Sequence, residues 1–196
     1  MKKLGIIVCG LVLMMGCERN IYRFTEGSVY GTVYHVSYQS EVDYTVEIRQ
    51  EMERVNQSLS MFNKESVIAR WNRGESERVD SLFVTMYEKA REVYEATGGG
   101  FDITVAPLVN AWGFGFKNEK LPSDGKIDSL LQYVGMDKVQ LEGVRLVKLV
   151  EGVQIDASSI AKGLGVDLVA EFFDREGVQN YMIEIGGEIR VKGESN

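Results

Sequence analysis

The sequence predicts an α+β fold, in which a mixed or antiparallel sheet packs against helices. Segments with apolar residues at helical spacing are interspersed with short runs rich in Val, Ile and Tyr, without the strict strand–helix–strand alternation of a parallel sheet. With 196 residues, of which 44% are hydrophobic and 26% charged, the chain is long enough to bury a core. One globular domain is therefore expected, and we place it at residues 28–196.

The first strand is expected in "SVYGTVYHVSY", where Gly31 marks a bulge or a close backbone approach. A helix follows, with Asp43 or Thr45 as its cap. Its apolar residues recur every three or four positions: Ile48, Met52, Val55 and Leu59. "SMFNKESVIARWN" is predicted to be a loop that enters a short apolar turn. A second helix is expected from near Asp80 to the glycines of "TGGG", since glycine adopts the left-handed conformation that ends helices.

"FDIT" is expected to begin a strand, and a third helix is predicted at about residues 124–134. The alternating segment "KVQLEGVRLVKLVEGVQID" predicts a hairpin or meander with turns near Gly143 and Gly152. The next helix is expected from about 159 to 176 and ends at Gly177. "NYMIEIGGEIRV" is predicted to be a strand that its Gly-Gly pair interrupts.

The first 17 residues, "MKKLGIIVCGLVLMMGC", are typical of a secretory signal. Two lysines precede an apolar run that is too short to span a bilayer, which needs about 20 apolar residues. The segment ends like a bacterial lipobox, in which a cysteine, here Cys17, becomes the lipidated first residue of the mature chain. The alternative is a signal peptide that is cut elsewhere, with Cys17 incidental.

Lipidation at Cys17 predicts an exported protein that is anchored in a bacterial membrane, on its periplasmic or extracytoplasmic side. Residues 18–27 then form a short tether that keeps the domain near the membrane surface. Each buried CH₂ contributes about 0.8 kcal/mol, so two or three acyl chains anchor a protein firmly. Cleavage at this site also removes Cys9, which excludes a disulfide framework.

The formal net charge of −7 argues against nucleic acid as a partner, because binding to phosphates needs a basic face. The single histidine, His35, lies within a strand pattern and is expected to be structural or surface-exposed. The sequence contains no P-loop, no cluster with zinc-ligand spacing and no evident Ser-His-Asp arrangement. Small ligands or proteins remain as the expected partners.

"VQIDASSIAKGLGVD" carries the clearest signal of a binding site. An apolar strand delivers Asp156 to its end, and two serines can cap the helix that follows. Free N–H groups and the helix dipole make such a helix start an anion site, and Lys162 adds a cation to an end that is already positive. A bound phosphate explains that cation, whereas a solvated lysine beside a capping Ser158 is the equally weighted alternative.

"GGGFDITVAPLVNAWGFG" combines glycines, one carboxylate and large aromatic side chains. With Asp102, this combination suggests backbone amides and a flat wall beside a planar ligand. Phe62 offers another surface on which a ring can stack, since stacking on a base is worth about 1–3 kcal/mol. The alternatives are a helix stop made by the glycines and ordinary core positions for the aromatic residues.

These two segments and "IEIGGEIRVKG", preceded in order by "YGTVYHV" and "SLSMFNKESVIARWN", resemble the ApbE family of FAD:protein FMN transferases over about residues 28–193. The resemblance implies a T-fold-like α+β architecture. It implies binding of FAD and Mg²⁺ and transfer of FMN to a Ser or Thr hydroxyl of an acceptor protein in a membrane redox complex, with release of AMP.

The resemblance also assigns site residues by position. The flavin-site pattern falls on Tyr30, Phe62, Gly100, Phe101, Asp102, Asp156 and Lys162. The metal contact falls on Ser159, through its backbone oxygen. No catalytic residue or general base is assigned.

The chain departs from the family pattern at three points. Tyr30 stands where Met is usual, and Phe62 stands where Tyr or Trp is common; both can still pack on a flat ring. Family members are longer, and their second half carries further metal ligands, so the domain is expected to be truncated. Two alternatives share the same site: an FAD pyrophosphatase that gives FMN and AMP, and a non-catalytic FAD-binding lipoprotein.

We expect Cys17→Ser to release the protein from the membrane fraction, because the substitution removes the atom that carries the lipid. Fractionation of cells that express the intact protein measures this, with Cys9→Ser as the control that stays on the membrane. An unchanged distribution of the Cys17→Ser variant would contradict the lipoprotein assignment.

Overall fold

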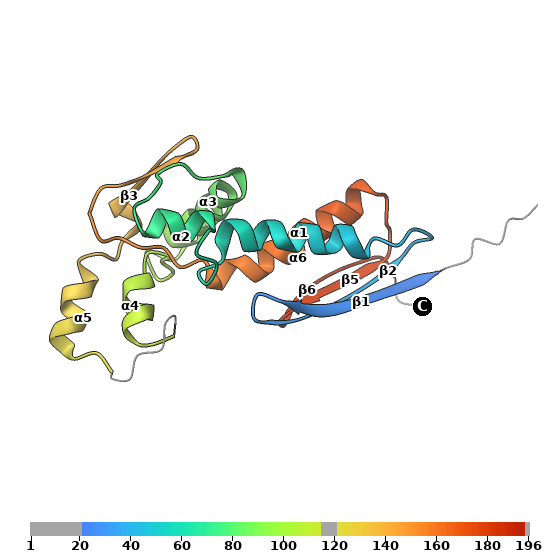
Figure 1. The fold of residues 1–196 in the computed structure, drawn as a ribbon, viewed down its shortest axis with the longest axis horizontal. Coiled ribbons are helices and arrows are strands. Elements are labelled where there is room, and N and C mark those ends of the chain that lie inside the picture. The colour runs from blue at the N-terminus through green and yellow to red at the C-terminus, as the bar shows by residue number, and fades with distance from the viewer. Residues whose placement is uncertain (1–20, 115–120, 195–196) are drawn as a thin grey trace, which may run out of the picture.

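The computed structural model describes residues 21–114 and 121–194, and it confirms the α+β fold (Figure 1). The predicted signal peptide and Cys17 lie outside the described residues. Two parts are evident along the long axis of the molecule: a four-stranded sheet with two long helices, and a mainly helical part with a two-stranded sheet.

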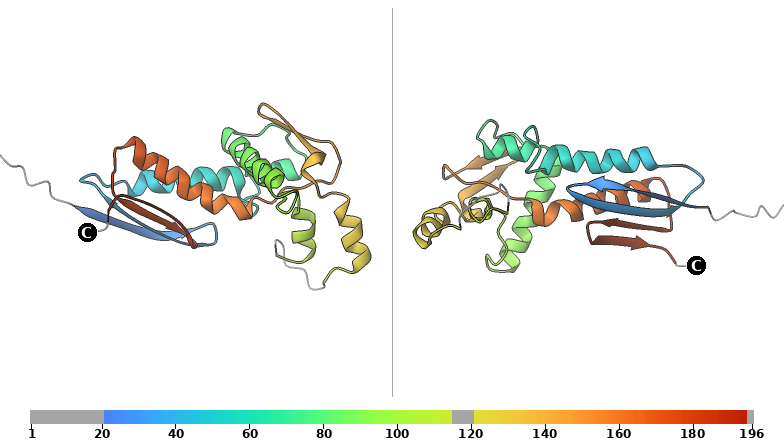
Figure 2. Two further views of the ribbon diagram at one scale, coloured as in Figure 1. Left: turned by 180° about the vertical axis from the view of Figure 1, so that it is seen from behind. Right: turned by 60° about the horizontal axis from the view of Figure 1, so that its bottom comes forward.

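The four-stranded sheet is antiparallel throughout, in the order β1-β2-β5-β6. Helices α1 and α6 cover one of its faces, as the two further views also show (Figure 2). The elements of this part are β1 (Tyr22–Val29), β2 (Thr32–Gln39), α1 (Thr45–Leu59), α6 (Ser158–Arg175), β5 (Tyr181–Ile185) and β6 (Glu188–Lys192).

The second part is built between α1 and α6 in the sequence. Its elements are α2 (Val67–Asn72), α3 (Ser81–Ala96), α4 (Ala106–Ala111), α5 (Asp124–Leu131), η1 (Met136–Lys138), β3 (Val139–Glu142) and β4 (Arg145–Lys148). Strands β3 and β4 form the predicted hairpin around Gly143, and α4 lies beside α5 at the far end (Figures 1 and 2).

Each part has its own buried core. The rings of Phe173 and Tyr38 pack at a tilt, with centroids 4.9 Å apart, in the core between the sheet and its helices. Trp71 and Phe83 lie in the other core, where the Trp71 indole N–H donates to the Leu146 carbonyl oxygen (2.8 Å). Tyr30 packs against both cores, so its side chain sits at their junction.

The helix boundaries follow local signals that the sequence analysis identified. The Asp80 side chain accepts a hydrogen bond from the Phe83 N–H (2.8 Å) and so caps α3. Gly177 adopts φ +76° just after the end of α6, which confirms the predicted helix stop. None of the helices among the described residues is both long and apolar enough to cross a membrane.

Three strand predictions need correction. "SVYGTVYHVSY" is not one strand but the end of β1, a turn and β2, because Tyr30 (φ +52°) and Gly31 (φ +75°) adopt the left-handed conformation that a tight hairpin requires. The Gly-Gly pair likewise forms the turn of a hairpin between β5 and β6. "FDIT" does not begin a strand, because the Asp102 carboxylate accepts the Thr104 N–H and closes a local turn before α4.

Two glycines in α6 serve different purposes, and alanine substitutions should separate them. A Cβ at Gly165 would stand 2.9 Å from the Tyr30 hydroxyl oxygen and 3.0 Å from its ring, whereas a Cβ at Gly163 would meet no atom within 4 Å. Tyr30 cannot move away freely, since its hydroxyl donates to the Met52 carbonyl oxygen (2.6 Å). We expect Gly165→Ala to lower the free energy of unfolding by about 1–3 kcal/mol.

The matched substitution Gly163→Ala should instead raise the free energy of unfolding by up to about 1 kcal/mol, the difference in helix propensity between glycine and alanine. Urea unfolding of both variants measures the contrast. Equal effects at the two positions would contradict the assigned packing of Tyr30.

Candidate functional site

The two segments with the strongest sequence signals lie side by side. The Asp156 N–H donates to the Ile103 carbonyl oxygen (2.8 Å), and Val105 forms a parallel bridge with Gln154. Asp102 and Asp156, which are far apart in the sequence, therefore come from adjacent stretches of backbone. Val153 and Ile155 are fully buried while Gln154 and Asp156 are partly exposed, so this extended segment presents one face to the site.

Asn72, the last residue of α2, holds the same segment from the other side. Its Nδ2 amide donates to the Ile155 carbonyl oxygen (2.9 Å), and its Oδ1 accepts from the Ile155 N–H (2.8 Å). The side chain thus pairs with the backbone as a neighbouring strand would. Residues 153–156 are fixed between Asn72 and the 103–105 segment.

The Asp102 carboxylate is fixed through one of its two oxygens. Oδ1 accepts from the Thr104 N–H (2.7 Å) and from the Thr104 hydroxyl (2.6 Å). That buried hydroxyl in turn accepts from the Gly135 N–H (2.6 Å). Oδ2 of Asp102 accepts no hydrogen bond from any residue in the described ranges, so it is available to a ligand hydroxyl.

Asp156 is oriented in a similar way at the start of α6. Its Oδ1 accepts from the Ser158 N–H (2.7 Å), and its Oδ2 has no partner within the described part of the chain. The expected capping by serine side chains is wrong: the helix begins at Ser158, neither serine hydroxyl caps it, and Asp156 satisfies the first free N–H. Ser158 and Ser159 are exposed in the first turn.

Lys162 joins the first turn of α6 to the β5–β6 hairpin. Its ammonium donates to the Gly186 carbonyl oxygen (3.3 Å). Gly186 is itself packed tightly, because a Cβ there would lie 2.6 Å from the Thr32 methyl carbon. The motifs "IAKG" and "IGGE" thus meet in space.

Glu184 stabilises the turn that Lys162 contacts. Its carboxylate accepts from the Gly187 N–H (2.5 Å) and pairs with the His35 Nδ1 (2.7 Å). The hydrogen bond with His35, and then the one from Gly187, lowers the pKa of Glu184 below its ordinary value. His35 is therefore a surface residue that supports the hairpin, which agrees with the expectation for it.

A cavity of about 950 Å³ opens between the loop before α2, α4, α5 and residues 152–154. Its volume lies within the range of about 300–1,000 Å³ that is usual for ligand sites. Phe62 is 70% exposed at its wall, and Asn72, Tyr133 and Gln154 also line it. Gln154 lines the cavity, and Asp156, on the same face of the segment, follows two residues later just before α6.

The predicted site residues fall into three groups. Asp102, Asp156, Ser159 and Lys162 gather around the start of α6, and Phe62 lines the cavity. Phe101 is half-buried against the core, next to the exposed Gly100. Tyr30 lies at the junction of the two cores, where burial, and then the charge of Glu53, raises the pKa of its hydroxyl.

Sequence reasoning missed four residues that shape this region: Asn72, Thr104, Tyr133 and Gln154. Asn72 carries a local signal, since an asparagine that ends the apolar turn "VIARW" can reach backbone groups. The role of Thr104 depends on Gly135, which is distant in the sequence, and no local pattern indicates it.

The described residues do not supply a full set of ligands for Mg²⁺. Within residues 21–114 and 121–194, no group of three or more His, Cys, Asp or Glu side chains could hold a metal ion. Mg²⁺ prefers six oxygen ligands in octahedral geometry, and the backbone oxygen predicted at Ser159 supplies one of them.

The ApbE family model matches residues 30–196. An FAD:protein FMN transferase of Vibrio cholerae is 34% identical over 205 residues, which cover 98% of this chain and 61% of that protein. An FAD:protein FMN transferase of Haemophilus influenzae is 36% identical, with coverage of 100% and 62%. The chain thus spans about three fifths of the length of these relatives.

Solved structures agree with the sequence comparisons. The flavin transferase ApbE of Vibrio cholerae superposes with a TM-score of 0.84 at 34% identity, covering 89% of this chain and 60% of that chain. The apo form of the flavinyl transferase ApbE of Pseudomonas stutzeri gives 0.83 at 29% identity, with coverage of 89% and 59%.

Replacement of Asn72 tests the attachment of residues 153–156. In Asn72→Ala, the N–H and C=O of buried Ile155 lose their partners, and each unsatisfied group costs about 1–3 kcal/mol. We expect the free energy of unfolding to fall by about 2 kcal/mol or more, measured by urea unfolding.

Asn72→Asp retains the acceptor but not the donor, so its loss should be intermediate. Asn56→Ala is the control, because the Asn56 amide donates only to Glu53 on the same helix, and it should change stability little. An Asn72→Ala variant as stable as the Asn56→Ala variant would show that the two Asn72–Ile155 hydrogen bonds do not hold residues 153–156 in place.

Proposed function

This chain belongs to the ApbE family, and we propose that it carries a major part of the FAD site of an FAD:protein FMN transferase. The observation that carries the proposal is the convergence of "FDIT", "IDASSIAKG" and "IEIGGE" around the start of α6. These three segments bring together two half-satisfied carboxylates, a lysine and the Ser159 N–H, which has no acceptor among the described residues.

FAD fits the chemistry of these residues. The first turn of α6 and the Lys162 ammonium suit the pyrophosphate, because a helix start and a cation both favour anions. The open oxygens of Asp102 and Asp156 can accept hydrogen bonds from ribityl or ribose hydroxyls. Phe62 at the cavity wall offers a face for a planar ring. The open flank of Gly163 allows close approach to the α6 backbone.

The proposed reaction is a phosphoryl-group transfer. The oxygen of an acceptor Ser or Thr hydroxyl forms a bond to the FMN-side phosphorus of FAD, and the bond from that phosphorus to the bridging oxygen breaks. AMP leaves with the electron pair, and the hydroxyl proton passes to a base that the described residues do not identify. Lys162 and the Ser159 N–H at the start of α6 stabilise charge on the phosphate oxygens during this step.

Mg²⁺ belongs to this proposal as the cation that the resemblance implies, with Ser159 as its contact. When bound, such a cation would neutralise phosphate charge. Since the described residues do not supply a set of ligands, no step above depends on it.

The proposed setting is the extracytoplasmic side of a bacterial membrane, with Cys17 as the lipid anchor and a membrane redox subunit as the acceptor. A short tether would raise the effective concentration of enzyme and acceptor without any new contact. The signal-like first 17 residues support this placement.

Lys162→Ala tests the anion site. Loss of a charged hydrogen bond costs about 1.5–3 kcal/mol, so we expect FAD to bind at least about tenfold more weakly in the intact, processed protein. Quenching of FAD fluorescence, with and without Mg²⁺, measures this affinity. Lys89→Ala, which removes an exposed lysine paired with Glu92 on α3, is the control that should leave it unchanged.

Incubation with FAD, Mg²⁺ and an acceptor domain should give a covalently fluorescent acceptor band and AMP. Free FMN and AMP without the band would instead assign a pyrophosphatase, and FAD retention without products a binding protein. A large drop in the melting temperature of Lys162→Ala would mark Lys162 as structural and contradict its role in binding.

A further inference from the structure

Two arginines in the described ranges donate no side-chain hydrogen bond and form no ion pair with a described residue: Arg70 and Arg78. The Glu75 carboxylate pairs with Arg73 (2.6 Å), and this hydrogen bond, more than the charge of Arg70, lowers the pKa of Glu75. Every other described arginine donates at least one side-chain hydrogen bond: Arg23, Arg49, Arg54, Arg73, Arg91, Arg145, Arg175 and Arg190.

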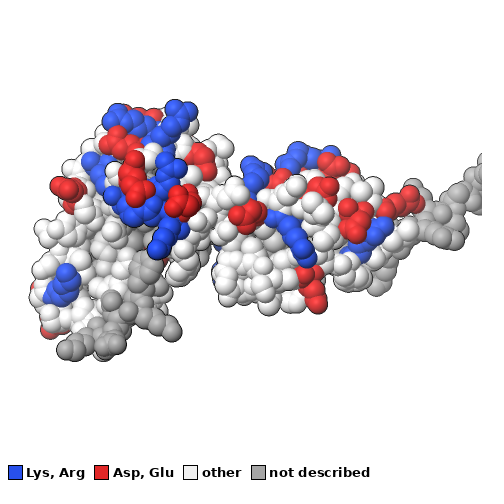
Figure 3. All heavy atoms as spheres, in the orientation of Figure 1, with Lys and Arg blue, Asp and Glu red and all other residues white. Residues whose placement is uncertain are grey.

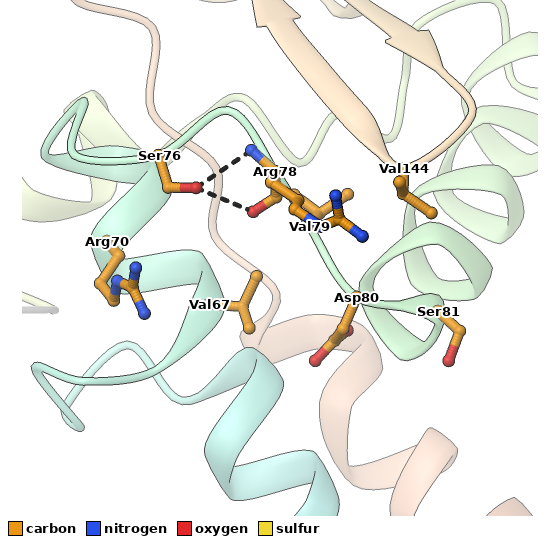
Figure 4. A pocket seen from close by; sticks show the side chains of 8 residues that line it. All are labelled: Val67, Arg70, Ser76, Arg78, Val79, Asp80, Ser81 and Val144. Atoms are coloured by element: carbon orange, nitrogen blue, oxygen red, sulfur yellow. Dashed lines mark hydrogen bonds between the residues drawn. The ribbon is translucent and has the colours of Figure 1, made fainter.

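Both unpaired arginines line one hollow of about 450 Å³, which we name the α2 hollow (Figure 4). Arg70 projects from α2, and Arg78 projects from the segment that leads to α3. Val67 and the exposed Val144 of the β3–β4 turn supply apolar surface to the same hollow. Two free guanidinium groups and apolar side chains thus face the same space.

We propose that the α2 hollow binds an acidic peptide segment of a partner protein. Guanidinium groups bind carboxylates through two parallel hydrogen bonds, and arginine clusters are a common means of recognising acidic motifs. In the α2 hollow, carboxylates of the segment pair with Arg70 and Arg78 while an apolar side chain packs on Val67 and Val144.

The lining favours a peptide over a nucleotide or a phosphate group. No aromatic side chain among its described residues offers a surface for a base. The Asp80 carboxylate also lies at the wall, fixed by the Ser58 hydroxyl and the Phe83 N–H at 2.8 Å each. A compact dianion would be repelled there, whereas carboxylates spaced along a peptide can each reach one arginine.

The charged surface around the α2 hollow also suits a peptide whose carboxylates are spaced apart. Basic side chains gather, with several acidic ones between them, over the part of the molecule that carries α2 (Figure 3). The opposite side of α2 contributes Ala69 and Asn72 to the large cavity. A peptide in the α2 hollow would therefore lie across one short helix from the proposed flavin site. The identity of the partner as the acceptor protein rests on the proposed function, but the peptide site itself does not.

Fluorescence anisotropy with the intact protein, without FAD, tests the site. The probe is a fluorescein-labelled peptide, Gly-Asp-Val-Glu-Val-Asp-Gly, and its control is Gly-Asn-Val-Gln-Val-Asn-Gly. We expect the acidic peptide to bind at least about tenfold more tightly, and Arg70→Gln or Arg78→Gln to weaken its binding about tenfold each. Arg54→Gln, which removes an exposed arginine paired with Glu51 on α1, should leave binding unchanged.

Equal binding of the two peptides would overturn the proposal, as would binding that neither Arg70→Gln nor Arg78→Gln weakens. Inorganic phosphate that displaces the peptide at equal concentration would assign the hollow to a phosphate group instead. Both variants should melt at the wild-type temperature, because neither side chain has a partner to lose. Since FAD is absent from the assay, a failure here is distinct from a failure of the proposed flavin site.

Discussion

Residues 153–156 are attached on both sides, and the positions of the proposed binding groups depend on that double attachment. Asn72 pairs with Ile155 from one side, and Ile103 and Val105 hold the segment from the other. The buried side chains of Val153 and Ile155 fix which face is turned outward. Asp156 therefore reaches the start of α6 in one orientation, beside the turn that holds Asp102.

The two cores of the molecule meet at Tyr30, and helices α1 and α6 contribute residues to both cores. Tyr30 takes a left-handed conformation between β1 and β2, and its ring packs on both cores while its hydroxyl is bonded to α1. A bulky residue in that conformation is costly, and the surrounding packing must stabilise it. Because Gly165 of α6 makes room for this ring, the same contact positions the helix whose start carries the proposed anion site.

Features of the fold that depend on nearby residues could be predicted from the sequence, whereas features that depend on contacts between distant segments could not. The α3 cap at Asp80, the helix stop at Gly177 and the hairpin around Gly143 follow from signals within a few residues. The turn at Tyr30 was missed because tyrosine rarely adopts a positive φ, and only tertiary packing explains it. For the site, motif order indicated Asp102, Asp156 and Lys162, but the supporting roles of Asn72 and Thr104 depend on partners that no local pattern identifies.

The hydrogen bond between Lys162 and Gly186 positions the Lys162 ammonium group before a ligand binds. Ordering a free lysine side chain costs up to about 2 kcal/mol in conformational entropy. Because Lys162 is already ordered in the folded protein, ligand binding does not have to order it again. An ammonium group has three N–H donors, so two remain for an incoming anion while the third stays on the hairpin. The positive charge of Lys162 is thus preorganised. If the proposed diphosphate binds here, its negative charge is balanced by a lysine that is already in position.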